Sequence, residues 1–203
     1  MIYYITYFLT KAISFIYFPR RIYGREHIPA QGGFIIASNH VSNLDPVVLG
    51  ISAVRRINFM AKIELFQKQP LGFILKELGA FPVKRGEADL WALKEAIKRL
   101  KKGMPVLIFL EGTRRIGDAP PQAQPGIGFL AVKSGVPVIP VFISGTQKVM
   151  PPGSRSWTRN PVSVRYGPPV VFDPKAPYEV IADTILQSIY RIPISGQKLA
   201  NSP

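Results

Sequence analysis

A chain of 203 residues, 47% of them hydrophobic, is long enough to fold as one domain around a sizeable core. Lysine and arginine number 26 against 12 acidic residues, and the net charge of +14 favours an anionic partner: a nucleic acid, an anionic membrane surface or a phosphate-bearing small molecule. The absence of cysteine excludes a thiol nucleophile, disulfides and thiolate metal sites, and two histidines are too few for a histidine-rich metal site.

Residues 1–18 are apolar and aromatic, and we expect them to form a helix. Its two faces would carry, on one side, Ile2, Ile5, Leu9, Ala12 and Ile16, and on the other Tyr3, Tyr7, Thr10, Ser14 and Tyr17. The segment is short for a membrane span, and its basic residues Arg20, Arg21 and Arg25 follow the apolar run, unlike those of a secretory signal. Tyrosine and arginine favour a membrane interface. We therefore predict a helix that lies in one leaflet, with a core helix packed on the domain as the alternative.

Beyond residue 22, strand-like and helix-like segments alternate, which predicts a single α/β domain with a mixed, mostly parallel sheet flanked by helices. Strands are expected over residues 34–37, 55–61, 81–84, 105–110, 136–143, 162–166 and 170–172. Helices are expected over residues 45–53, 65–78 with a break near Pro70, 89–102 with Asp89 as its cap, 129–133 and 178–190. The expected organisation is a membrane-associated helix over 1–21, a domain over 22–194 and a polar tail over 195–203.

Eight residues, Ser38-Asn39-His40-Val41-Ser42-Asn43-Leu44-Asp45, join the first of these strands to the helix over 45–53. Histidine can take and return a proton near neutral pH, and a carboxylate on its far ring nitrogen would fix the tautomer and stabilise the imidazolium. The five-residue separation lets Asp45 fold back onto His40, which favours a dyad that activates a hydroxyl. The alternative is an ordinary loop and helix start, in which Asp45 is the N-cap and Pro46 the first helical residue.

Two more groups of charged residues follow expected strands. Lys84 and Arg85 come after one strand, and Glu111-Gly112-Thr113-Arg114-Arg115 after another. Because the carboxyl ends of parallel strands share one edge of a sheet, these loops and the His40 loop are expected to converge. Arginine presents a planar fork of donors that suits phosphate, and Glu111 could hold that fork or bind a substrate hydroxyl.

In this order, the motifs resemble those of the glycerolipid acyltransferase family. The family pattern Asn-His-x-Ser-x-x-Asp is matched at every fixed position by residues 39–45, and Phe-x-x-Arg loosely by residues 79–85, with Arg85 as the arginine. Pro-Glu-Gly-Thr-Arg-Ser is matched by residues 110–115, except that Leu110 replaces proline and Arg115 replaces serine. Val-Pro-x-x-Pro-Val is matched by residues 136–141, and the resemblance covers roughly residues 24 to 172.

The resemblance implies transfer of a fatty acyl group from acyl-CoA or acyl-carrier protein to the free hydroxyl of 1-acylglycerol-3-phosphate, which gives phosphatidic acid for phospholipid synthesis. His40 would be the base and Asp45 would orient it. The substrate would be held by Arg85, Glu111, Gly112, Thr113 and Arg114. No metal or other cofactor is implied. The expected partners are the acyl donor, a lyso-phospholipid and an anionic membrane surface, and the expected location is the cytoplasmic face of the inner membrane.

Other readings remain open at this point. Another lyso-lipid could be the acceptor, and water in place of the lipid hydroxyl would make the chain a thioester hydrolase. A non-catalytic membrane-surface module is a third possibility. A nucleic-acid-binding protein would have a basic element with interleaved aromatic residues, and the charge here is spread along the chain instead.

Overall fold

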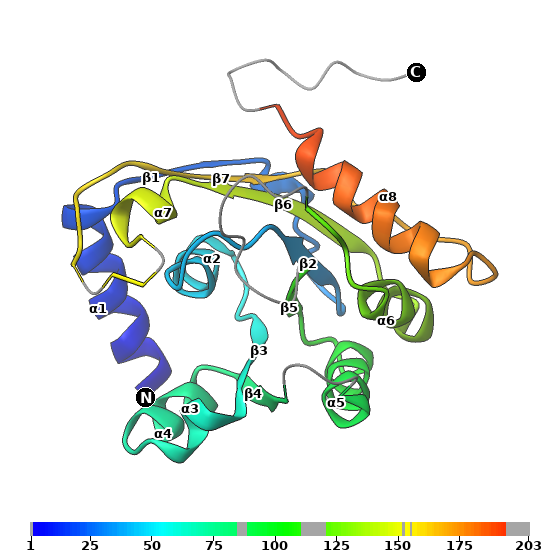
Figure 1. The fold of residues 1–203 in the computed structure, drawn as a ribbon, viewed down its shortest axis with the longest axis horizontal. Helices are drawn as coiled ribbons and strands as arrows, with labels where there is room; N and C mark the ends of the chain where they lie inside the picture. The colour runs from blue at the N-terminus through cyan, green and yellow to red at the C-terminus, as the bar shows by residue number, and fades with distance from the viewer. Residues whose placement is uncertain (1, 85–88, 111–120, 152, 155, 194–203) are drawn as a thin grey trace.

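The computed structural model describes residues 2–84, 89–110, 121–151, 153–154 and 156–193. Within these residues, seven strands form one sheet in the order β1-β7-β6-β2-β5-β3-β4 (Figure 1). They are β1 (Arg20–Tyr23), β2 (Ile35–Ser38), β3 (Asn58–Lys62), β4 (Ala80–Val83), β5 (Val106–Phe109), β6 (Val138–Ser144) and β7 (Val162–Tyr166). All neighbouring strands run parallel except β6 and β7, so the predicted mixed, mostly parallel sheet is confirmed.

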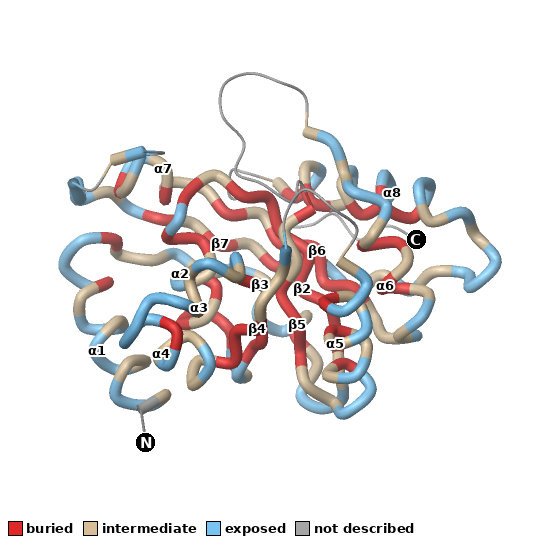
Figure 2. Tube along the Cα trace, turned by 60° about the horizontal axis from the view of Figure 1, so that its bottom comes forward, coloured by how far each residue is buried: buried red, intermediate tan, exposed pale blue. Residues whose placement is uncertain are grey.

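The described helices are α1 (Ile2–Tyr17), the 3-10 helix η1 (Arg25–His27), α2 (Asp45–Ser52), α3 (Ile63–Gln67), α4 (Leu71–Glu77), α5 (Leu90–Lys101), α6 (Gly126–Ser134), α7 (Thr146–Val149) and α8 (Tyr178–Tyr190). They cover both faces of the sheet and enclose two apolar cores. Along β2, Ile36 faces the core beneath α2, whereas Ile35 and Ala37 face the core under α5, α6 and α8. Buried residues therefore follow the central strands (Figure 2).

Most expected elements are present near their predicted bounds. The helix over 65–78 is broken in two, as α3 and α4, and Asp89 caps α5 by accepting a hydrogen bond from the Ala92 amide at 3.0 Å. The strand expected over 170–172 is wrong. Val170 forms only an isolated bridge to Val138, because Pro168 and Pro169 directly before it have no amide hydrogen to extend a ladder. The short elements β1 and α7 were not expected.

The first helix, α1, packs on the domain through its tyrosine-bearing face. Tyr3 and Tyr7 are half-buried, Ser14 is buried, and the helix contacts α2 and α4. The opposite face is exposed and apolar, with 58–81% of Ile5, Phe8, Leu9, Phe15 and Ile16 accessible. The predicted division into two faces is thus confirmed for Tyr3, Tyr7, Thr10 and Ser14, whereas Tyr17, expected on the same face, is 40% exposed. Among the described residues, no helix is long and apolar enough to cross a membrane.

The contact between α6 and α8 depends on a glycine. A Cβ atom on Gly128 would lie 2.1 Å from the carbonyl oxygen of Tyr178, at the start of α8, whereas one on Gly50 in α2 would meet nothing within 4 Å. We expect Gly128→Ala to lower the free energy of unfolding by about 2 kcal/mol through overpacking. The matched variant Gly50→Ala should be neutral or stabilise by up to about 1 kcal/mol, because alanine favours a helix. Urea titration measures both, and equal effects would contradict the close contact.

Candidate active site

The residues between β2 and α2 bring His40 and Asp45 together at the carboxyl edge of the sheet. His40 Nδ1 lies 2.8 Å from Asp45 Oδ2, and both side chains are buried. A carboxylate only accepts hydrogen bonds, so Nδ1 carries the proton and donates it to Oδ2. The predicted dyad is present in the structure.

Asp45 is completely buried, and its carboxylate accepts four hydrogen bonds. Besides the imidazole, the backbone amides of Val41 and Ser42 donate to Oδ2 at 2.7 and 2.8 Å, and the Thr146 hydroxyl donates to Oδ1 at 2.6 Å. The expected N-cap role is wrong, because the carboxylate turns back to the preceding loop and Leu44 occupies the cap position. Asp45 therefore holds the histidine loop in shape as well as orienting the ring.

The other ring nitrogen of His40 is available for chemistry. The imidazole stacks on the Phe109 ring at the end of β5, with centroids 4.0 Å apart and planes at 17°. Among the residues that the structure describes, none forms a hydrogen bond with Nε2. A neutral imidazole protonated on Nδ1 has its lone pair on Nε2, so His40 can accept a proton there.

Two further residues of the first motif anchor the loop. The Asn39 side-chain amide donates to the Ile143 carbonyl at 2.9 Å, and its oxygen accepts from the Ile143 amide at 2.8 Å. The Ser42 hydroxyl donates to the Met150 carbonyl at 2.9 Å. Each fixed residue of Asn-His-x-Ser-x-x-Asp thus has a physical role: Asn39 and Ser42 hold the loop against β6 and the segment after α7, and Asp45 positions His40.

Sequence reasoning missed Thr146. It is the first residue of α7, separated from the end of β6 by Gly145, and it is fully buried although its side chain is polar. A hydroxyl at the carboxyl end of a strand, shortly after the fourth motif, was the available signal. Its hydrogen bond partner is 101 positions away in the chain, so spacing alone could not connect the two residues.

The other predicted site residues, Arg85, Glu111, Gly112, Thr113 and Arg114, lie outside the described residues. The strands that lead to them are described: β4 ends at Val83 and β5 at Phe109, and both run parallel to β3. The Leu110 amide donates to the Ser38 carbonyl at 3.3 Å, next to the start of the histidine loop. On the other strand, the Lys84 amide donates to Asp89 at 2.8 Å and, with the Ala92 amide, lowers the pKa of that carboxyl.

Comparison with known proteins agrees with this fold. The family described as Acyltransferase matches residues 19–144, more than half of the chain. This match includes the His40–Asp45 loop, β5 and all of the strand β6 that leads to Thr146. The chain therefore belongs to the acyltransferase family.

The chain is similar to several proteins with one shared name. The 1-acyl-sn-glycerol-3-phosphate acyltransferase of Bacillus subtilis is 37% identical over 126 residues, 62% of each chain, and the human alpha enzyme of that name is 29% identical over 188 residues, 89% of this chain and 66% of the other. The crystal structure of the 1-acyl-sn-glycerophosphate (LPA) acyltransferase PlsC from Thermotoga maritima superposes with a TM-score of 0.74 at 29% identity, covering 92% of this chain and 76% of that one. The chain spans 39% of a chloroplastic relative from Brassica napus.

The hydrogen bond from Thr146 to Asp45 is open to direct test. We expect Thr146→Val to lower kcat for acyl transfer about tenfold with little change in KM, because a buried carboxylate that loses a donor holds the imidazole less firmly. Thr146→Ser, which keeps the hydroxyl, should recover most of the rate. Steady-state kinetics measures both parameters.

The matched control is Thr184→Val, in which the lost hydroxyl donates to the carbonyl of Val180 within α8. It should leave kcat unchanged. If Thr146→Ser were as slow as Thr146→Val, packing and not the hydroxyl would explain the effect.

Proposed function

We propose that the protein transfers a fatty acyl group from a thioester, acyl-CoA or acyl-carrier protein, to the free hydroxyl of 1-acylglycerol-3-phosphate, giving phosphatidic acid. The observation that carries this proposal is a buried imidazole whose Nδ1 is bound by a fully paired carboxylate and whose Nε2 has no partner in the described part of the chain. The shared name of the similar proteins from Bacillus and human supports the choice of acceptor.

His40 would act first as base and then as acid. Nε2 takes the proton of the acceptor hydroxyl as its oxygen attacks the thioester carbonyl, and Asp45 stabilises the imidazolium that forms. The tetrahedral intermediate then breaks its carbon–sulfur bond, and Nε2 returns the proton to the departing thiolate. The acyl group passes directly between the two substrates, so this chemistry needs no covalent acyl-enzyme, metal or other cofactor. Holding both substrates side by side supplies a large part of the rate enhancement.

The acceptor would be held by Arg85, Glu111, Thr113 and Arg114, with backbone amides near Gly112 as donors to the oxyanion. The contacts at the end of β5, the strand that leads to Glu111, support this placement. Phe109, two residues before Glu111, stacks on His40, and the Leu110 amide binds the carbonyl of Ser38. The glutamate motif therefore starts in direct contact with the catalytic loop.

The alternatives differ in what reaches Nε2. A different lyso-lipid acceptor would use the same dyad and change only the phosphate-binding residues. A thioester hydrolase would place water at Nε2. In a non-catalytic membrane module, the His40–Asp45 dyad would have no role in a reaction. The burial of four hydrogen bonds around Asp45 favours the enzymes, since surface binding alone does not require a buried carboxylate aimed at an imidazole.

We also propose that the protein works at the cytoplasmic face of the inner membrane, with α1 lying in the interface. The exposed residues Ile5, Phe8, Leu9, Phe15 and Ile16 form one apolar strip on this helix. Burial of such a strip in a leaflet stabilises association, and basic residues near its end add attraction to anionic headgroups. The acceptor lipid would then reach the site without leaving the bilayer.

Replacement of the base tests the proposed reaction. His40→Ala should lower kcat at least hundredfold in a protein that still folds, with a lower unfolding midpoint because the buried Asp45 carboxylate loses a donor, and Asp45→Asn should slow turnover while leaving acceptor binding largely intact. Formation of phosphatidic acid from labelled acyl-CoA and 1-acylglycerol-3-phosphate is the measurement. The control His27→Gln replaces the other histidine, whose Nδ1 binds the Tyr166 carbonyl outside the site, and should remain active. An active His40→Ala enzyme would refute the mechanism.

Replacement of exposed apolar residues tests the role of α1. We expect Phe8→Ser combined with Phe15→Ser to weaken binding to phospholipid vesicles about tenfold, because two aromatic rings no longer enter the leaflet. The same change at two exposed residues outside α1, Val171→Ser with Val180→Ser, should have little effect. Vesicle sedimentation gives the bound fraction. Equal losses in the two double variants would contradict a specific role for α1.

A further inference from the structure

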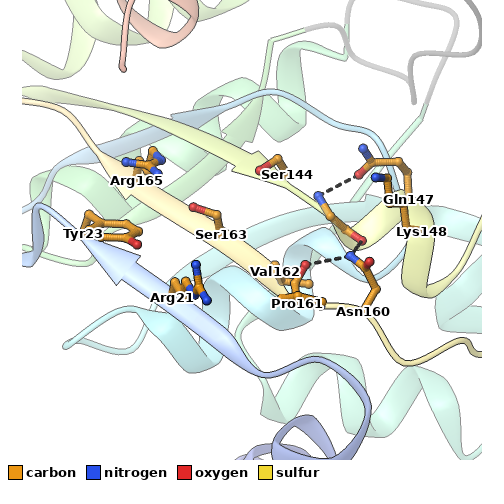
Figure 3. A pocket seen from close by; sticks show the side chains of 11 residues that line it. Arg21, Tyr23, Ser144, Gln147, Lys148, Asn160, Pro161, Val162, Ser163 and Arg165 are labelled. Carbon is orange, nitrogen blue, oxygen red and sulfur yellow. Dashed lines mark hydrogen bonds between the residues drawn. The ribbon is translucent and has the colours of Figure 1, made fainter. Parts of the chain in front are cut away.

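A basic cavity of about 400 Å³ lies on the sheet near the ends of β1, β6 and β7, beside α7 (Figure 3). The proposed reaction makes no use of it. Its cationic side chains come from three separate elements: Arg21 from β1, Arg165 from β7 and Lys148 from α7. Among the lining residues that the structure describes, none is acidic.

Sheet register brings these groups to one face. Arg21 pairs with Ser163 across β1 and β7, and Tyr23 pairs with Arg165 two residues further on, so all four side chains point to the same side. The Arg165 guanidinium lies 4.3 Å from the centre of the Tyr23 ring. Ser163 Oγ is buried and has no hydrogen-bond partner in the described part of the chain. Three positive charges and an unpaired hydroxyl around one cavity suit a phosphate group.

The residues around the cavity indicate whether the bound phosphate would belong to a lipid or to a soluble molecule. Asn160, which lines it, donates its backbone amide to the carbonyl of Tyr17 at the last turn of α1. Trp157 packs edge-on against the Tyr17 ring at 5.7 Å and is 42% exposed, and Phe15, two residues before Tyr17, is 81% exposed. Exposed tryptophan and tyrosine next to arginine and lysine are typical of the headgroup level of a bilayer.

We propose that this cavity binds the phosphate of an anionic phospholipid and so fixes the height and orientation of the domain on the membrane. The inference rests on the proposed association of α1 with a bilayer, but not on turnover. Its consequence for catalysis follows from the fold. β6 ends at Ser144 on the cavity wall, and Thr146, two residues later, binds Asp45. A headgroup bound there would hold the catalytic edge of the sheet against the bilayer.

The test compares vesicles of phosphatidylcholine with vesicles that also contain phosphatidic acid. Each basic residue near an anionic surface strengthens binding about fivefold, so Arg21→Gln with Lys148→Gln should weaken binding to the anionic vesicles about 25-fold and leave binding to phosphatidylcholine unchanged. The control, Lys101→Gln with Lys175→Gln, removes the same charge from exposed residues outside the cavity. It should weaken binding less than threefold. The unfolding midpoint of each variant checks the fold.

The outcomes separate this inference from its alternatives. Equal weakening in both double variants would show that only the overall charge matters and would overturn the site. Calorimetric titration with inorganic phosphate provides a third arm. Sub-millimolar binding that is lost in the Arg21/Lys148 variant would assign the cavity to a soluble phosphate and overturn the lipid assignment. Vesicle binding is measured without substrates. These results therefore test the cavity even if the proposed acyl transfer proves wrong.

Discussion

The buried carboxylate of Asp45 is the constraint on which the site depends. A carboxylate removed from water is costly by several kcal/mol unless its oxygens are paired. Here four donors surround it: an imidazole, two loop amides and the hydroxyl of Thr146. The loop must fold tightly for its amides to reach Oδ2, and β6 must end where Thr146 can reach Oδ1. The dyad geometry and the local fold therefore require each other.

Parallel strands explain why the site lies at this edge. β2, β5 and β6 run parallel, so the residues after their carboxyl ends meet: His40 after β2, Phe109 at the end of β5 and Thr146 after β6. The α2 helix then begins at Asp45 itself. Two of the family's motifs, residues 39–45 and 110–115, begin directly after β2 and β5, which gives their positions in the chain a structural reason.

Sequence alone predicted the parts of the site that are local. His40 and Asp45 are five residues apart, and the helix periodicity of residues 178–190 requires no partner to be recognised. Prediction from the sequence failed where the structure of a segment depends on a residue far away in the chain. Thr146 acquires its role from a residue 101 positions away, and β1 is a strand only because Arg20–Tyr23 pairs with β7, although its sequence looks like a basic surface segment. The cap assigned to Asp45 was wrong for a different reason: the preceding loop supplies its own donors, the amides of Val41 and Ser42, and these bind the carboxylate in place of the helix amides.

The proposed mechanism needs a proton-accepting nitrogen at Nε2 of His40, and the tautomer of that ring is its most direct test. Nitrogen-15 NMR of histidine-labelled protein distinguishes a protonated ring nitrogen from a bare one, and His27→Gln leaves His40 as the single histidine of the chain. We predict that neutral His40 carries its proton on Nδ1, with Nε2 bare, and that Asp45→Asn disturbs this preference. A neutral ring protonated on Nε2 would contradict the assignment of His40 as the base.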